Sequence, residues 1–152
     1  MANLPGAARQ RTLKQEVLFH GIGLHTGQEA TLRVGPAPPG EGRIFDCERG
    51  RVPARVENVA PSSRCTRLVA GGAEVLTPEH VLAALCGLHV DNARLVLEGP
   101  EVPILDGSAL PFAQAIQEAG IVTQDAPARV LTLRQPVWAG EGERHVLALP
   151  SD

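Results

Sequence analysis

An acidic residue and a histidine stand side by side in the segment EVLTPEHVLAALCGL, where Glu79 and His80 follow Thr77 and Pro78. A carboxylate can act as a general base and a neutral histidine can bind a metal, so the pair has the chemistry for metal-assisted hydrolysis. Adjacent helical residues point about 100° apart, so they can share a site only beyond the end of a helix. The alternative is structural, because the helix dipole favours an acidic residue in the first turn. The residue types alone leave both interpretations open.

The other histidines do not complete a metal-binding motif. His20 and His25 flank the glycine-rich segment HGIGLHTG, His89 follows the expected helix, and His145 lies near the C-terminal end of the chain. A catalytic zinc site needs three protein ligands, and no pair of these histidines has a convincing ligand spacing. A complete metal site within this chain is therefore not expected.

Two other candidates also have a structural and a functional interpretation. Asp106 and Gly107, in ILDGSALPF, predict a turn, although the Asp106 carboxylate could also brace a site. Cys65, in SSRCTRLV, is interpreted as a small buried hydrophobic residue, which is the usual role of a free cysteine. The three cysteines are an odd number without CxxC spacing, which favours free thiols in a reducing cytoplasm.

Two helices are expected to position these residues. Thr77 is a good N-cap and Pro78 suits the first helical position. Apolar residues at three-to-four spacing then predict one buried helix face, formed by Val81, Leu82, Leu85 and Leu88. A second helix is expected over residues 109–119, with Ser108 as its cap and Gly120 as its stop.

Short strands surround these helices. The strand candidates are TLKQEVLF, QEATLRV, RIFDC, VPARV, CTRLV, AEVL, ARLVL, RVLTLRQPVW and RHVLAL. Strands in a block with two late helices predict an α+β fold, in which both helices cover one face of a largely antiparallel sheet. Residues 1–125 are predicted to form one domain, and QDAPA, residues 124–128, looks like a linker. Residues 126–152 are interpreted as linker and first hairpin of an incomplete second domain, because two strands alone are marginally stable.

The composition excludes several classes of protein. The chain has 152 residues, of which 43% are hydrophobic, enough for a real core. A net charge of −3, only 3% aromatic residues and no tyrosine argue against nucleic-acid binding. No apolar run approaches the ~18 residues of a membrane span. The start, MANLPGAARQ, lacks the features of a signal peptide, so a cytoplasmic location is expected.

Three segments together resemble the UDP-3-O-acyl-N-acetylglucosamine deacetylases, the zinc enzymes of lipid A biosynthesis. The segments are RQRTLKQEVLFHGIGLHTG, TPEHVLAALCGLHVDN and PEVPILDGSALPF, in the family's order and at similar spacing. The resemblance runs from Arg9 to about Leu149. It implies a two-layer βα sandwich of the ribosomal protein S5 domain 2-like fold. It also implies a second domain of similar fold, with the active site between the two.

The resemblance also implies a reaction and roles for four residues. The family removes the N-acetyl group from UDP-3-O-acyl-N-acetylglucosamine, using zinc to activate the attacking water. By this resemblance Glu79 is the general base and His80 is one of three zinc ligands. The resemblance also implies that Cys65 lines the substrate site near the zinc and that the loop with His25 lies near this site.

The resemblance stops before the second half of the family's site. The other two zinc ligands belong to an H-K-x-x-D motif in the second domain, and His145 and Asp152 do not form that motif. The chain is therefore expected to be about half of an enzyme, inactive and weakly zinc-binding by itself. The alternative is a non-enzymatic remnant or binding module, whose exposed apolar helix faces would favour self-association. An H-K-x-x-D motif encoded downstream of Asp152 would favour the enzyme.

Overall fold

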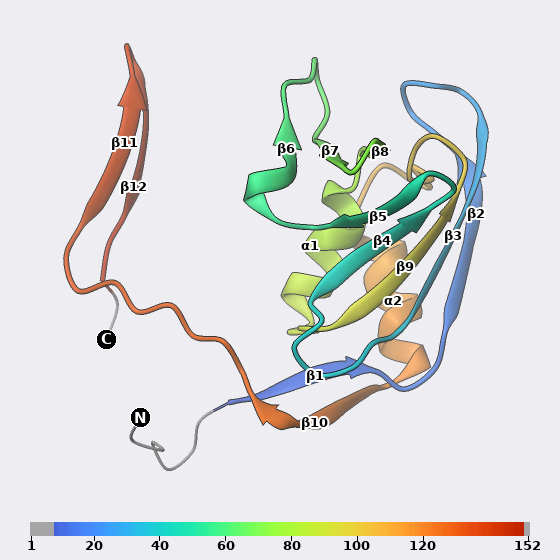
Figure 1. Cartoon of the computed structure of the whole chain (residues 1–152), viewed down its shortest axis with the longest axis horizontal. Coiled ribbons are helices and arrows are strands. Elements are labelled where there is room, and N and C mark those ends of the chain that lie inside the picture. The colour runs from blue at the N-terminus through green and yellow to red at the C-terminus, as the bar shows by residue number, and fades with distance from the viewer. Residues whose placement is uncertain (1–7, 151–152) are drawn as a thin grey trace.

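The computed structural model describes residues 8–150, in which two α-helices pack on one face of a five-stranded sheet (Figure 1). In chain order the strands are β1 (Arg9–Leu13), β2 (Val17–Ile22), β3 (Glu29–Pro36), β4 (Arg43–Cys47), β5 (Gly50–Pro53), β6 (Val59–Ala60), β7 (Arg67–Ala70), β8 (Ala73–Leu76), β9 (Ala93–Glu98), β10 (Ile121–Pro127), β11 (Val137–Glu141) and β12 (Arg144–Ala148). The helices are the 3₁₀ helix η1 (Val56–Asn58), α1 (Glu79–Gly87) and α2 (Leu110–Ala119).

The main sheet has the strand order β2-β3-β9-β4-β5. All its neighbours are antiparallel except β4 and β9, which are parallel. Smaller sheets are formed by β6-β7-β8, by β1 with β10, and by the β11–β12 hairpin. The predicted α+β class, with a largely antiparallel sheet and both helices on one face, is confirmed.

The core lies between the main sheet and the two helices. Alternate residues of β3 and β9 are buried, as period-two side-chain geometry requires. On α1, Val81 and Leu85 are fully buried, so the predicted apolar face is correct. Phe112 of α2 packs on Phe19 of β2, with ring centroids 4.8 Å apart and a tilted geometry that favours aromatic pairs. These contacts fix both helices against the sheet.

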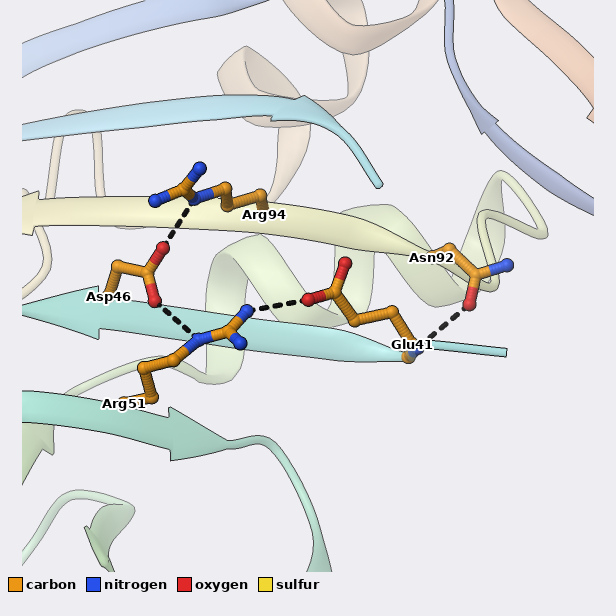
Figure 2. A network of polar contacts seen from close by, with 6 residues as sticks. Glu41, Asp46, Arg51, Asn92 and Arg94 are labelled. Carbon is orange, nitrogen blue, oxygen red and sulfur yellow. Dashed lines mark hydrogen bonds and ion pairs between the residues drawn. The ribbon is translucent and has the colours of Figure 1, made fainter. Parts of the chain in front are cut away.

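On the opposite face of the sheet, charged side chains gather over β4, β5 and β9 (Figure 2). Asp46 of β4 accepts hydrogen bonds from Arg51 of β5, at 2.8 Å, and from Arg94 of β9. Arg51 also reaches Glu41 at 2.5 Å. Exposed ion pairs of this kind each contribute roughly 0–1 kcal/mol. Their main effect is to keep this face polar, which leaves the helical face to bury the apolar residues.

Three strand predictions need correction. The segment TLKQEVLF is not one strand, because a bend at residues 14–16 separates β1 from β2. β1 pairs with β10, outside the main sheet. Most of the expected linker QDAPA belongs to β10, where Pro127 is in register with Arg9. The segment RVLTLRQPVW becomes a strand only at Val137, because no strand of the described chain pairs with the preceding residues. The predicted domain boundary thus falls inside β10, and the division into domains stays a prediction.

The hairpin of β11 and β12 is the one predicted from the sequence, and both strands are exposed along their whole length. Trp138 is 69% exposed. Large exposed apolar side chains also lie on β2, at Leu18 and Ile22. Within residues 8–150, Leu110 is the sole large exposed apolar residue on an α-helix. The expectation of exposed apolar helix faces is therefore wrong for this region, and self-association stays a prediction.

Neither α-helix of the described chain is long and apolar enough to span a membrane.

Candidate active site

The helix that carries Glu79 and His80 begins without a side-chain cap. The prediction that Thr77 caps it is wrong, because the Thr77 hydroxyl donates instead to the Glu101 carboxylate at 2.6 Å. Thr77 has a φ of 55°, in the left-handed region, and Pro78 occupies the position before the first helical residue. The chain therefore enters α1 through a sharp turn, and Glu79 is in the first turn of the helix as predicted.

Glu79 and His80 are both half-buried at this helix start. One carboxylate oxygen of Glu79, Oε1, accepts a hydrogen bond from the backbone N–H of Thr66 at 3.3 Å. The other, Oε2, is buried and has no hydrogen-bond partner among the described residues. A buried polar atom without a partner is unfavourable and needs an explanation beyond the fold. This oxygen is available to a group that the described residues do not supply.

Cys65 is adjacent to the residue that holds Glu79. It is half-buried, and its Sγ lies 3.0 Å from Ser62 Oγ. Because Thr66 donates to Glu79, the segment with Cys65 lies beside the start of α1. The structure therefore brings together two of the predicted site segments that are separate in the sequence.

His25 reaches the same region through its backbone rather than its ring. It lies in the loop between β2 and β3 and is exposed. Its N–H donates to the carboxylate of Glu101 at 3.0 Å, and Glu101 accepts the Thr77 hydroxyl on its other oxygen. The loop of His25 is thus tied to the residue that leads into Pro78 and Glu79.

Glu101 is the residue that the sequence interpretation missed. Its side chain is fully buried, at 0% exposure. Besides His25 and Thr77, its carboxylate accepts from the N–H and the hydroxyl of Thr26, at 2.9 and 3.0 Å. A Cβ added to Gly23 would lie 2.4 Å from Glu101 Oε2, so this close approach requires glycine there. The sequence signal that could have identified Glu101 is an acidic residue inside the apolar segment PEVPIL. A carboxylate that is buried with such a segment needs hydrogen-bond donors around it.

The remaining candidates have structural roles. Asp106 accepts from the N–H and hydroxyl of Ser108, both at 2.9 Å, which forms the predicted turn. The Ser108 hydroxyl accepts from Leu110 N–H at 3.1 Å, but Ala109 occupies the cap position of α2, so the prediction that Ser108 caps this helix is wrong. Gly120, with a φ of 82°, ends α2 as predicted. In the part of the chain that the structure describes, no three His, Cys, Asp or Glu side chains gather as a metal site.

The chain is similar to a known family of enzymes over most of its length. The sequence profile of the family described as UDP-3-O-acyl N-acetylglycosamine deacetylase (LpxC) matches residues 10–152. The chain belongs to this family. The match includes all three segments around Glu101, namely the His25 loop, the start of α1 and the segment before α2.

Several members of the deacetylase family are similar over nearly the whole chain. The UDP-3-O-acyl-N-acetylglucosamine deacetylase of Myxococcus xanthus is 44% identical over 97% of the chain and 48% of its own length. That of Thermosynechococcus vestitus is 45% identical over 95% of the chain and 52% of its own length. The bifunctional enzyme LpxC/FabZ of Chlorobaculum tepidum is 45% identical over 94% of the chain and 32% of its own length. The chain thus spans about half the length of the LpxC deacetylases.

Acid is expected to weaken the Glu101 cluster of this LpxC-family chain. Burial raises the pKa of the Glu101 carboxyl, but hydrogen bonds from Thr77, Thr26 and His25 outweigh it and hold the pKa below its usual 4.5. A lowered folded-state pKa stabilises the fold above the unfolded pKa, and this stability is lost as pH falls through the folded pKa. The side chains in contact with the carboxylate are neutral threonines.

The test compares wild type with Glu101→Gln in urea unfolding of the 152-residue chain. The difference in their free energies of unfolding should stay constant from about pH 7 to about pH 5 and narrow toward about pH 3. The comparison removes the contributions of the other carboxylates, which both proteins share. A difference that grows on acidification would contradict a lowered pKa for Glu101.

Proposed function

We propose that this chain supplies the general-base half of a zinc-dependent deacetylase that acts on UDP-3-O-acyl-N-acetylglucosamine in lipid A biosynthesis. Family membership supports the reaction and the substrate. The observation that carries the proposal is Glu79 Oε2, a buried carboxylate oxygen that has no partner within residues 8–150, on the residue next to His80.

Glu79 is proposed to take the proton from the water that attacks the amide. Its Oε1 is fixed by Thr66 N–H, so the side chain has one anchored oxygen and one free oxygen. A general base needs this combination, because its reactive oxygen must point in a set direction and must not already be occupied by a donor of the protein. The proton on Glu79 then becomes available to the departing amine, which leaves acetate and a free amino sugar.

His80 is proposed as this chain's ligand for zinc. When bound, zinc would polarise the amide carbonyl and lower the pKa of water. The half-buried imidazole beside a carboxylate suits that ion. The other ligands of a three-ligand site would come from the half of the deacetylase that lies beyond the described residues. Cys65 and the His25 loop would then border the substrate.

The same proposal includes a ribosomal protein S5 domain 2-like classification for the sandwich, and a cytoplasmic location. It also includes residues 126–152 as the first part of a second domain. The chain alone is expected to be inactive and to lose zinc on dialysis, since His80 alone cannot hold the metal.

The proposal can be tested with a hybrid enzyme. The full 152-residue chain is joined to the part of the Myxococcus xanthus deacetylase that lies beyond the aligned region, and acetate release from UDP-3-O-acyl-N-acetylglucosamine is measured. The hybrid should be active and should retain zinc after dialysis, whereas the chain alone should do neither. A folded, zinc-bound hybrid without activity would favour the non-enzymatic remnant.

A further inference from the structure

We propose that Glu101 and Thr77 form a positioning pair that sets the direction of Glu79 and His80 at the start of α1. The inference rests on the proposed function, because it concerns the alignment of that reaction's base and metal ligand. Neither residue touches the reacting groups, so both are positioning residues.

Thr77 holds an unfavourable backbone conformation. Its φ of 55° is rare for a β-branched residue, and it is almost completely buried. Such conformations persist only where surrounding contacts over-determine them, and they cluster at functional sites. Two contacts hold Thr77: its N–H donates to Thr66 O at 3.0 Å, and its hydroxyl donates to Glu101 Oε1 at 2.6 Å.

Thr66 links this turn directly to the base. Its carbonyl accepts from Thr77, while its N–H donates to Glu79 Oε1. A rotation of the backbone at Thr77 would therefore weaken the hydrogen bond to the Thr66 carbonyl. The displaced Thr66 would then weaken its own N–H bond to Glu79 and let that side chain move. The same rotation would redirect Pro78, whose ring fixes its own φ, and with it the first turn of α1.

Glu101 is a rigid anchor for this turn. Its two oxygens are occupied by donors from His25, Thr26 and Thr77, so the carboxylate has little freedom to follow a displaced hydroxyl. The neighbouring Val102 N–H also donates to Leu76 O at 3.1 Å, which ties the segment of Glu101 to the residue before Thr77. The strained turn is thus held from a second segment of the chain.

The kinetic test uses variants at position 77 in the hybrid enzyme. Thr77→Val keeps the shape but removes the hydroxyl, and Thr77→Ser keeps the hydroxyl. Because small displacements of reacting groups can lower rates about 100-fold, we expect Thr77→Val to lower kcat about 10- to 100-fold with little change in KM. Thr77→Ser should stay near wild type. Gly87→Ala, at the far end of α1 where an added Cβ meets nothing, is the control.

A second measurement does not depend on activity. In the 152-residue chain, the backbone amide proton of Thr66 reports its hydrogen bond to Glu79 by NMR. Thr77→Val should shift this proton upfield and reduce its protection from exchange, and Thr77→Ser and Gly87→Ala should leave it unchanged. An inactive hybrid with this shift would refute the proposed function but not the positioning pair. An unmoved Thr66 resonance in Thr77→Val, or equal kcat losses in Thr77→Val and Thr77→Ser, would overturn the positioning role.

Discussion

Replacing Glu79 by glutamine is expected to lower kcat of the hybrid enzyme about 10²- to 10⁴-fold, the contribution typical of a positioned general base. Glutamine has the same shape and can still accept from Thr66 N–H through its amide oxygen. It cannot accept the proton of the attacking water. KM and zinc content should therefore change little while turnover is lost.

The same substitution should not destabilise the protein. Glu79 Oε2 is a buried carboxylate oxygen that no residue of the described chain pairs with, and burying charge without a partner is unfavourable. The free energy of unfolding of the Glu79→Gln variant should therefore equal or exceed that of the wild type. This is expected where a site keeps an unfavourably buried carboxylate for its function. Loss of turnover together with retained stability separates a catalytic role from a structural one.

Glu74→Gln is the matched control for Glu79. Glu74 lies on β8 and pairs with Arg67 at 2.7 Å on the surface, so its replacement should leave kcat unchanged. If both variants keep kcat within a few-fold of wild type, Glu79 is not the base.

Replacing His80 by alanine is expected to release zinc and abolish turnover. Loss of an outer-shell partner of a metal ligand already lowers affinity about 10–100-fold, so loss of the ligand itself should have a larger effect. Zinc is measured by mass spectrometry after dialysis of the hybrid against chelator-treated buffer. Excess zinc should restore part of the activity of a weakened site, but not to the wild-type level.

His89→Asn is the matched control for His80. His89 is exposed beyond the far end of α1 with a φ of 54°, a conformation that asparagine tolerates. This variant should keep its zinc and its turnover. A His80→Ala hybrid with full zinc content would show that the metal is bound without His80.

Local patterns in the sequence were sufficient for much of the fold. The apolar spacing of Val81 and Leu85 predicted the buried face of α1, and Gly120 predicted the end of α2. Strands such as β4 and β9 followed from short apolar runs between turn residues. In each case the signal and the structure it specifies lie within a few residues of one another.

The errors arose where distant residues decide the local structure. Thr77 has every property of an N-cap, but Glu101, 24 residues away, takes its hydroxyl. The Glu101 carboxylate also binds the backbone of His25, 76 residues away. The segment QDAPA has the composition of a linker, yet its pairing with β1 makes it a strand. Composition and periodicity do not contain these contacts.

In the candidate site, too, some features follow from local sequence and others depend on contacts between distant residues. The adjacent pair Glu79 and His80 could be selected from residue types and resemblance. Only the folded structure shows that one oxygen of Glu79 is held by Thr66 while the other is buried and has no partner among residues 8–150.

The most direct measurement is anomalous X-ray diffraction at the zinc edge from crystals of the zinc-loaded hybrid enzyme. The account predicts one strong peak about 2.0–2.1 Å from a ring nitrogen of His80, beside the carboxylate of Glu79 at the start of α1. A peak held by other residues, with His80 unligated and Glu79 Oε2 still without a partner, would contradict it.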